Sequence, residues 1–86
     1  MAQGGKATRA DVERLVSIAL VTDWVVRECG AEGLSGMLLA TMPSVLKQLT
    51  PEALATGRKR VHERATRYKS KDAACRVLKG QLVKIQ

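Results

Sequence analysis

The chain has 86 residues, 45% of them hydrophobic but only 2% aromatic, and a formal net charge of +7. This length allows one domain with a modest core, and a core of Leu, Val, Ala and Met suits packed helices better than a sheet. The two cysteines, Cys29 and Cys75, are too few for the disulfide framework of a small secreted domain, and no apolar leader or membrane-spanning stretch is readable. We therefore predict an all-α cytoplasmic protein with reduced cysteines: a flexible segment 1–8, then a single helical domain over residues 9–86, a compact bundle of about four short helices.

The stretch from Arg9 to Cys29 organises the chain, because it has a helical pattern and is apolar on more than one side. A carboxylate in its first turn, Asp11, is favourable to the helix dipole. Gly30 follows at the position that often turns left-handed after a helix. A helix this apolar needs covering on two sides. The rest of the chain can cover one side, and we expect a second copy or another protein to cover the other.

Three apolar residues of this first helix, Leu20, Val21 and Trp24, fall outside its main apolar stripe, where a surface helix is normally polar. We predict that they form a protein interface, through which the chain makes a homodimer or docks on a target, since Trp is enriched at interface hot spots. The alternative is that the other helices of the same chain bury Trp24.

Asp23 is an unusual residue in this helix, because it falls on the same stripe as Val12 and Val16. A buried carboxylate needs a partner. Arg27, one turn further on, is the local candidate, and an arginine from the basic helix described below or from a second subunit is the other. The alternative is a helix edge, where Asp23 reaches water.

The segment after the first helix, residues 30–36, spells GxxGxxG. A phosphate-binding loop normally follows a strand, whereas this one follows a helix and carries Glu32. We interpret it as a helix exit and a helix entry with Ser35 as N-cap. The helical period then resumes, and Pro43 is expected to kink or split this second helix.

Two more helices are predicted from their start signals. Thr50, Pro51 and Glu52 supply a cap, a proline at the first position and a carboxylate in the first turn, so a helix should run from there to about residue 68. Ser70 caps a last helix through about residue 79, because Gly80 weakens it. The tail at 82–85 has no assignment.

The positive charge is concentrated at the C-terminal end of the sequence. Residues 1–57 hold five basic and six acidic residues, whereas residues 58–86 hold ten basic and two acidic ones. In the third helix and beyond, basic residues recur about once per helical turn and line one face if the helix continues far enough, opposite an inward apolar stripe. Guanidinium groups spaced in this way suit a row of phosphates. The predicted contacts to nucleic acid or to an acidic partner are Arg58, Lys59, Arg60, Arg64, Arg67, Lys69 and Lys71. The alternative is a solvated helix face that only keeps the protein soluble.

The sequence offers little catalytic chemistry. His62 is the only histidine and has no carboxylate at a spacing that would orient it as a general base. Together with Cys29 and Cys75 it lacks the short ligand spacings of a zinc site. We expect no catalytic, metal or cofactor site and no small-molecule substrate. A helix-turn-helix starting at Ala53 also fails, because Glu63 stands where that motif needs an apolar residue.

These features lead to two hypotheses. The first is a small, basic, non-enzymatic regulatory protein that contacts nucleic acid phosphates through its Arg/Lys helix face, with binding that falls steeply with salt. The alternative is a protein-binding inhibitor or adaptor, for example a mobile-element regulator, that docks on a target through the hydrophobic first helix, with the basic residues facing an acidic surface.

Overall fold

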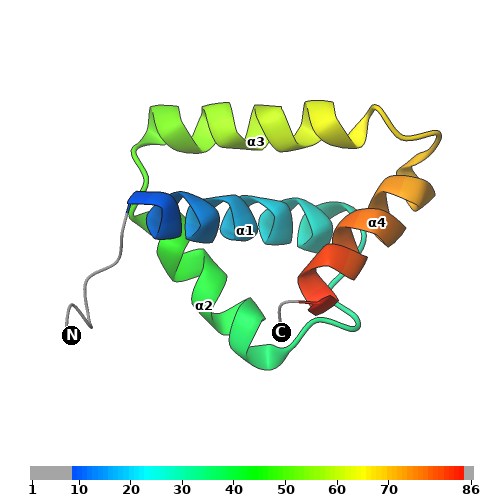
Figure 1. Ribbon diagram of the computed structural model, residues 1–86, viewed down its shortest axis with the longest axis horizontal. Coiled ribbons are helices and arrows are strands. Elements are labelled where there is room, and N and C mark those ends of the chain that lie inside the picture. The colour runs from blue at the N-terminus through cyan, green and yellow to red at the C-terminus, as the bar shows by residue number, and fades with distance from the viewer. Residues whose placement is uncertain (1–8, 85–86) are drawn as a thin grey trace.

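The computed structural model describes residues 9–84, and this part of the chain forms four α-helices and no strand (Figure 1). The prediction of an all-α bundle is therefore confirmed. The predicted flexible segment 1–8 lies outside the described residues. None of the helices in residues 9–84 is both long and apolar enough to cross a bilayer. The helices are α1 (Arg9–Glu28), α2 (Gly36–Lys47), α3 (Pro51–Ala65) and α4 (Lys71–Lys84).

Three of the four helices begin where the sequence predicts a cap. Ser35 precedes α2, Thr50 precedes α3 and Ser70 precedes α4. In each case the side-chain hydroxyl accepts a hydrogen bond from the backbone amide three residues later, at 3.1 Å. Each cap satisfies an amide that has no partner inside its helix and contributes about 1 kcal/mol. Gly30 has a φ of +93°, so α1 ends in the left-handed turn that was predicted.

Three helices differ in detail from the sequence expectation, α2 in its interior and α3 and α4 at their C-terminal ends. α2 continues through Pro43 as one element, so it is not split there. α3 ends at Ala65, before the predicted end at about residue 68. The backbone amides of residues 67 and 68 donate hydrogen bonds to the carbonyls three residues earlier, 64 and 65, and these shorter-range bonds tighten the chain into a turn. α4 continues past Gly80 to Lys84. The burial of Leu82, which is 2% exposed, outweighs the poor helix propensity of the glycine.

α1 is the central helix of the molecule. α2, α3 and α4 each pack against it, and α3 also contacts α4. In Figure 1, α1 and α3 lie side by side and run in the same direction, α2 crosses α1 on the other side, and α4 lies across the C-terminal end of α1. Three neighbours within one chain therefore bury part of the apolar surface of α1, whereas Val12, Leu15 and Val26 stay 49%, 42% and 39% exposed. The main core cluster comprises Leu20, Val21, Trp24, Val25, Val61, Ala65, Ala74, Leu78 and Leu82.

The close packing of α1 against α3 depends on Gly57. This glycine is buried in α3, and a Cβ placed on it would lie 2.5 Å from Cδ1 and 2.9 Å from Cδ2 of Leu20. Real Cβ atoms do not approach other carbons so closely, so Leu20 occupies the space that a larger residue at position 57 would fill. Gly57 is thus a packing residue.

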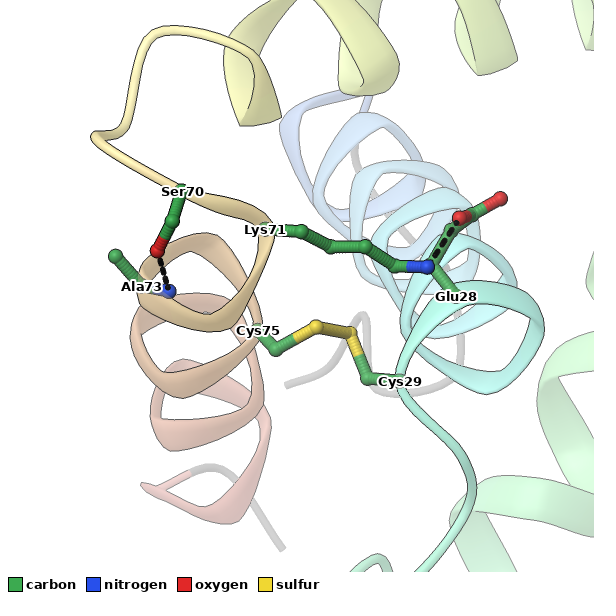
Figure 2. Close-up of a disulfide and its surroundings, with 6 residues drawn as sticks. All are labelled: Glu28, Cys29, Ser70, Lys71, Ala73 and Cys75. Atoms are coloured by element: carbon green, nitrogen blue, oxygen red, sulfur yellow. Dashed lines mark hydrogen bonds and ion pairs between the residues drawn. A yellow bond between two sulfur atoms is a disulfide. The ribbon is translucent and has the colours of Figure 1, made fainter.

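α4 is joined covalently to the end of α1. Cys29 and Cys75 form a disulfide, with 5.8 Å between their Cα atoms, across a sequence separation of 46 residues (Figure 2). The prediction that both cysteines are reduced is therefore wrong. It rested on the number of cysteines, which says nothing about whether two helices bring a pair together. A disulfide is typical of oxidising compartments, so the cytoplasmic location that rested on reduced cysteines loses this support.

Candidate nucleic-acid interface

Only two of the ten basic residues between positions 58 and 84 form an ion pair within the described chain. Arg58 pairs with Asp23, with 3.2 Å between Nε and Oδ2, and Lys71 pairs with Glu28, with 3.2 Å between Nζ and Oε1. Lys79 is half-buried and the other seven unpaired residues are exposed. We call these eight the basic set: Lys59, Arg60, Arg64, Arg67, Lys69, Arg76, Lys79 and Lys84.

Asp23 holds two arginines together on the opposite flank of α3 from Arg60 and Arg64. Its carboxylate accepts hydrogen bonds from Nη2 of Arg27 at 2.9 Å and from Nε of Arg58 at 3.2 Å, and its side chain is only 12% exposed. Both partners predicted from the sequence, the local arginine and one from the basic helix, are therefore present. Arg58 shares the single charge of Asp23 with Arg27, and Lys71 is paired with Glu28, so these two are the weaker members of the predicted phosphate contacts.

Arg60 and Arg64 lie one helical turn apart on α3 and line the same groove between α1 and α3, a hollow of about 550 Å³. Val16, Leu20 and the carboxylate Glu13, all from α1, line it as well. Nη2 of Arg64 also donates a hydrogen bond to Oε1 of Gln81 in α4, at 3.3 Å. The groove is therefore lined by apolar side chains, two arginines and one carboxylate, and Arg64 is oriented by a neutral partner that leaves its charge uncompensated.

The basic row predicted to continue along a single helix is interrupted. Since α3 ends at Ala65, Arg67 and Lys69 lie in the turn between α3 and α4, and Lys71 is the first residue of α4. Lys69 and Lys71 line another hollow of about 320 Å³, together with Trp24. The cations thus follow the C-terminal half of α3 and then turn with the chain into α4, rather than forming one straight line.

The predicted protein interface lies inside the molecule. Leu20, Val21 and Trp24 are 8%, 5% and 4% exposed, respectively, because α3 and α4 cover the part of α1 that carries them. These three side chains are not available to a partner, so a homodimer through them is ruled out; the exposed apolar residues of α1 are others, Val12, Leu15 and Val26. The Trp24 indole Nε1 has no hydrogen-bond partner in the described chain, so its burial is driven by the apolar ring.

The remaining candidates for chemistry do not come together. His62 is exposed on α3, and residues 9–84 contain no group of three or more His, Cys, Asp or Glu side chains that could hold a metal ion. The feature that sequence reasoning missed is the disulfide. The only signal for it was that both cysteines fall on apolar helix faces in the sequence pattern. Buried unpaired cysteines do so as well, so this signal does not identify a disulfide.

Comparisons with known proteins found no matching family model, no significantly similar curated protein and no significantly similar solved structure. The function therefore has to be argued from the arrangement of the residues.

Proposed function

We propose that the protein is a non-enzymatic binding protein that holds the phosphate backbone of a nucleic acid against the basic set. The observation that carries the proposal is that eight cations in the last third of the chain have no carboxylate partner in the described structure. Concentrated like charge lowers the stability of a fold through self-repulsion. A polyanion that neutralises several of these cations at once releases counterions and binds tightly at low salt.

The chemistry of the set favours phosphate over a single acidic group. Arg60, Arg64 and Arg67 carry guanidinium groups, which form paired hydrogen bonds with phosphate oxygens. The first two lie one turn apart on one flank of α3, and the third follows in the turn. A phosphate backbone offers anionic groups at repeated intervals, and such contacts position a nucleic acid without reading its sequence.

The protein has no exposed aromatic side chain among its described residues on which an unpaired base could stack. The chain has one Trp and one Tyr; Trp24 is buried and Tyr68 is half-buried against the core. Proteins that bind single strands without sequence preference use exposed aromatic side chains as stacking platforms. A duplex, or a folded RNA with duplex segments, is therefore the form of nucleic acid that fits the basic set.

The test is a fluorescence anisotropy titration of a labelled DNA duplex and a labelled RNA hairpin at low salt. Arg60→Gln with Arg67→Gln removes two charges of the basic set, and Arg14→Gln with Lys47→Gln removes two exposed charges elsewhere. We expect the first double variant to weaken binding about tenfold or more and the control to change it about twofold or less. Absence of binding by the wild-type protein, or equal loss in both variants, would contradict the proposal.

An acidic protein surface is the competing partner, because it too would neutralise the basic set. A protein partner differs from a nucleic acid partner in its resistance to nuclease. If the protein is purified from its source together with bound material, nuclease treatment removes a nucleic acid partner but leaves a protein partner in place. Retention of a stoichiometric protein after nuclease, together with no binding to either nucleic acid, would favour the competing function.

A further inference from the structure

The Cys29–Cys75 disulfide lies at the surface, in a charged hollow. Both cysteines are half-buried, and both line a hollow of about 490 Å³ at the junction of α1 and α4. The same hollow is lined by three cations, Lys71, Arg76 and Lys79. Structural disulfides that are sealed in a core are inert because no thiol can reach them, whereas this one borders an open space.

The charge around the disulfide favours an anionic reagent. Two carboxylates, Glu28 and Asp72, also line the hollow, and Figure 2 shows Lys71 of α4 reaching beside the disulfide to Glu28 of α1, with 3.2 Å between Nζ and Oε1. That pair is neutral as a unit. Arg76 and Lys79 have no carboxylate partner within the described chain. Because Asp72 is the only other carboxylate among the lining residues, these two cations leave the hollow with a net positive charge.

The two sulfurs differ in their surroundings. Cys29 directly follows the last residue of α1, at the negative end of that helix dipole. Cys75 lies inside α4, three residues after Asp72 and one helical turn before Lys79, and all three line the hollow. A thiolate is stabilised by nearby cations and disfavoured at the C-terminal end of a helix, so Cys75 is the better leaving group of the two.

We propose that this disulfide is an exchange site for a small anionic thiol of the glutathione class, which attacks Cys29. The thiolate of the reagent forms a bond with Sγ of Cys29 while the Cys29–Cys75 bond breaks, and the electron pair leaves with Sγ of Cys75 as a thiolate. A second reagent thiolate then attacks the mixed disulfide, releases the oxidised reagent and leaves Cys29 as a thiolate, which takes up a proton. Two reagent thiols are oxidised for each protein disulfide reduced.

The experiment measures reduction of the folded, full-length protein by glutathione, which is anionic, and by cysteamine, which is cationic. We expect Arg76→Gln with Lys79→Gln to lower the ratio of the glutathione rate to the cysteamine rate by about threefold or more at low salt, since each lost charge changes the encounter with a charged reagent. Lys59→Gln with Arg60→Gln is the matched control, because both residues lie on α3 and do not line the hollow. The control should leave the ratio unchanged.

Trapping the intermediate tests the direction of attack. Acid quenching at early times followed by peptide mass spectrometry should find the glutathione adduct on Cys29 and the free thiol on Cys75. An adduct mainly on Cys75 would overturn the assigned direction. If glutathione reduces the protein only when urea is added, or if the rate ratio is the same in all three proteins, the site is a structural disulfide and the proposal fails. None of these outcomes depends on nucleic-acid binding.

Discussion

At the scale of single residues, two glycines in helices have opposite roles. Gly57 is buried, and Leu20 fills the place where its Cβ would lie. Gly80 lies inside α4, and a Cβ placed on it would meet nothing within 4 Å. Alanine is the better helix former by about 1 kcal/mol at either position, so only the packing environment distinguishes the two sites.

We expect Gly80→Ala to raise the free energy of unfolding by about 1 kcal/mol. Gly57→Ala should lower it by about 1–2 kcal/mol, because Leu20 must leave its position in the core and α3 must move away from α1. Urea unfolding of both variants checks this. Adding Leu20→Ala to Gly57→Ala should cost less than the sum of the two single changes. If Gly57→Ala were as stable as Gly80→Ala, the close approach of the two helices would be refuted.

Asp23 gives a second test at this scale. Asp23→Asn removes the charge that holds Arg27 and Arg58 together and leaves two like charges as neighbours. We expect a loss of about 1 kcal/mol in the free energy of unfolding, and a smaller loss at high salt. Because Arg58 is then free to contact phosphate, nucleic-acid affinity should rise. A fall in affinity would show that Asp23 orients Arg58 for binding instead of withdrawing it.

Local residue chemistry also explains how much of the fold was predictable. The capping hydroxyls of Ser35, Thr50 and Ser70 act within one helical turn, so their positions can be read from sequence. The same is true of the left-handed Gly30. The end of α3 and the length of α4 depend on burial against other helices, and such tertiary effects override local propensity.

At the scale of secondary-structure elements, α1 determines how the molecule is built. Its apolar pattern on several sides was readable, but the sequence could not say whether the covering surface comes from the same chain or from a partner. The structure answers this question for the buried part of α1, because α2, α3 and α4 of the same chain each pack against it, while Val12, Leu15 and Val26 stay exposed. Leu20, Val21 and Trp24 are core residues for that reason, and the partner predicted for them is not needed.

α4 is the element whose attachment depends most on one bond. It packs on α1 through Ala74, Leu78 and Leu82, and the disulfide ties its second turn to the end of α1. In the chain-entropy model, a disulfide that closes a loop of 46 residues raises the free energy of unfolding by about 4 kcal/mol. That is a large part of the stability of a domain this small.

We therefore expect Cys29→Ser with Cys75→Ser to lower the free energy of unfolding by about 3–4 kcal/mol. The single tryptophan reports the change, because Trp24 lies where α3 and α4 meet over α1. Its emission should shift to longer wavelength at a lower urea concentration than in the oxidised wild type. Fully reduced wild-type protein is the control and should behave like the double variant. Equal stability of oxidised and reduced protein would show that the disulfide does not constrain α4.

At the scale of the whole molecule, the net positive charge is confined to the C-terminal third of the chain, whereas both parts supply core residues. Residues 1–57 supply α1, α2 and nearly balanced charge, whereas the ten basic residues lie on α3, the following turn and α4. This uneven distribution of charge was visible in the sequence. The division of the basic residues into paired and unpaired ones was not, because it depends on the folded positions of Asp23 and Glu28, which neutralise Arg58 and Lys71.

The most direct test of the proposed function is the salt dependence of binding to a DNA duplex. Each phosphate neutralised by a protein cation adds about 0.9 to the slope of log K against log salt concentration. We predict a steep negative slope for the wild type, and a slope shallower by about 2 for Arg60→Gln with Arg67→Gln. The Arg14→Gln, Lys47→Gln control should keep the wild-type slope. A wild-type slope near zero, or the same slope in all three proteins, would contradict the assignment of the basic set as a phosphate-binding surface.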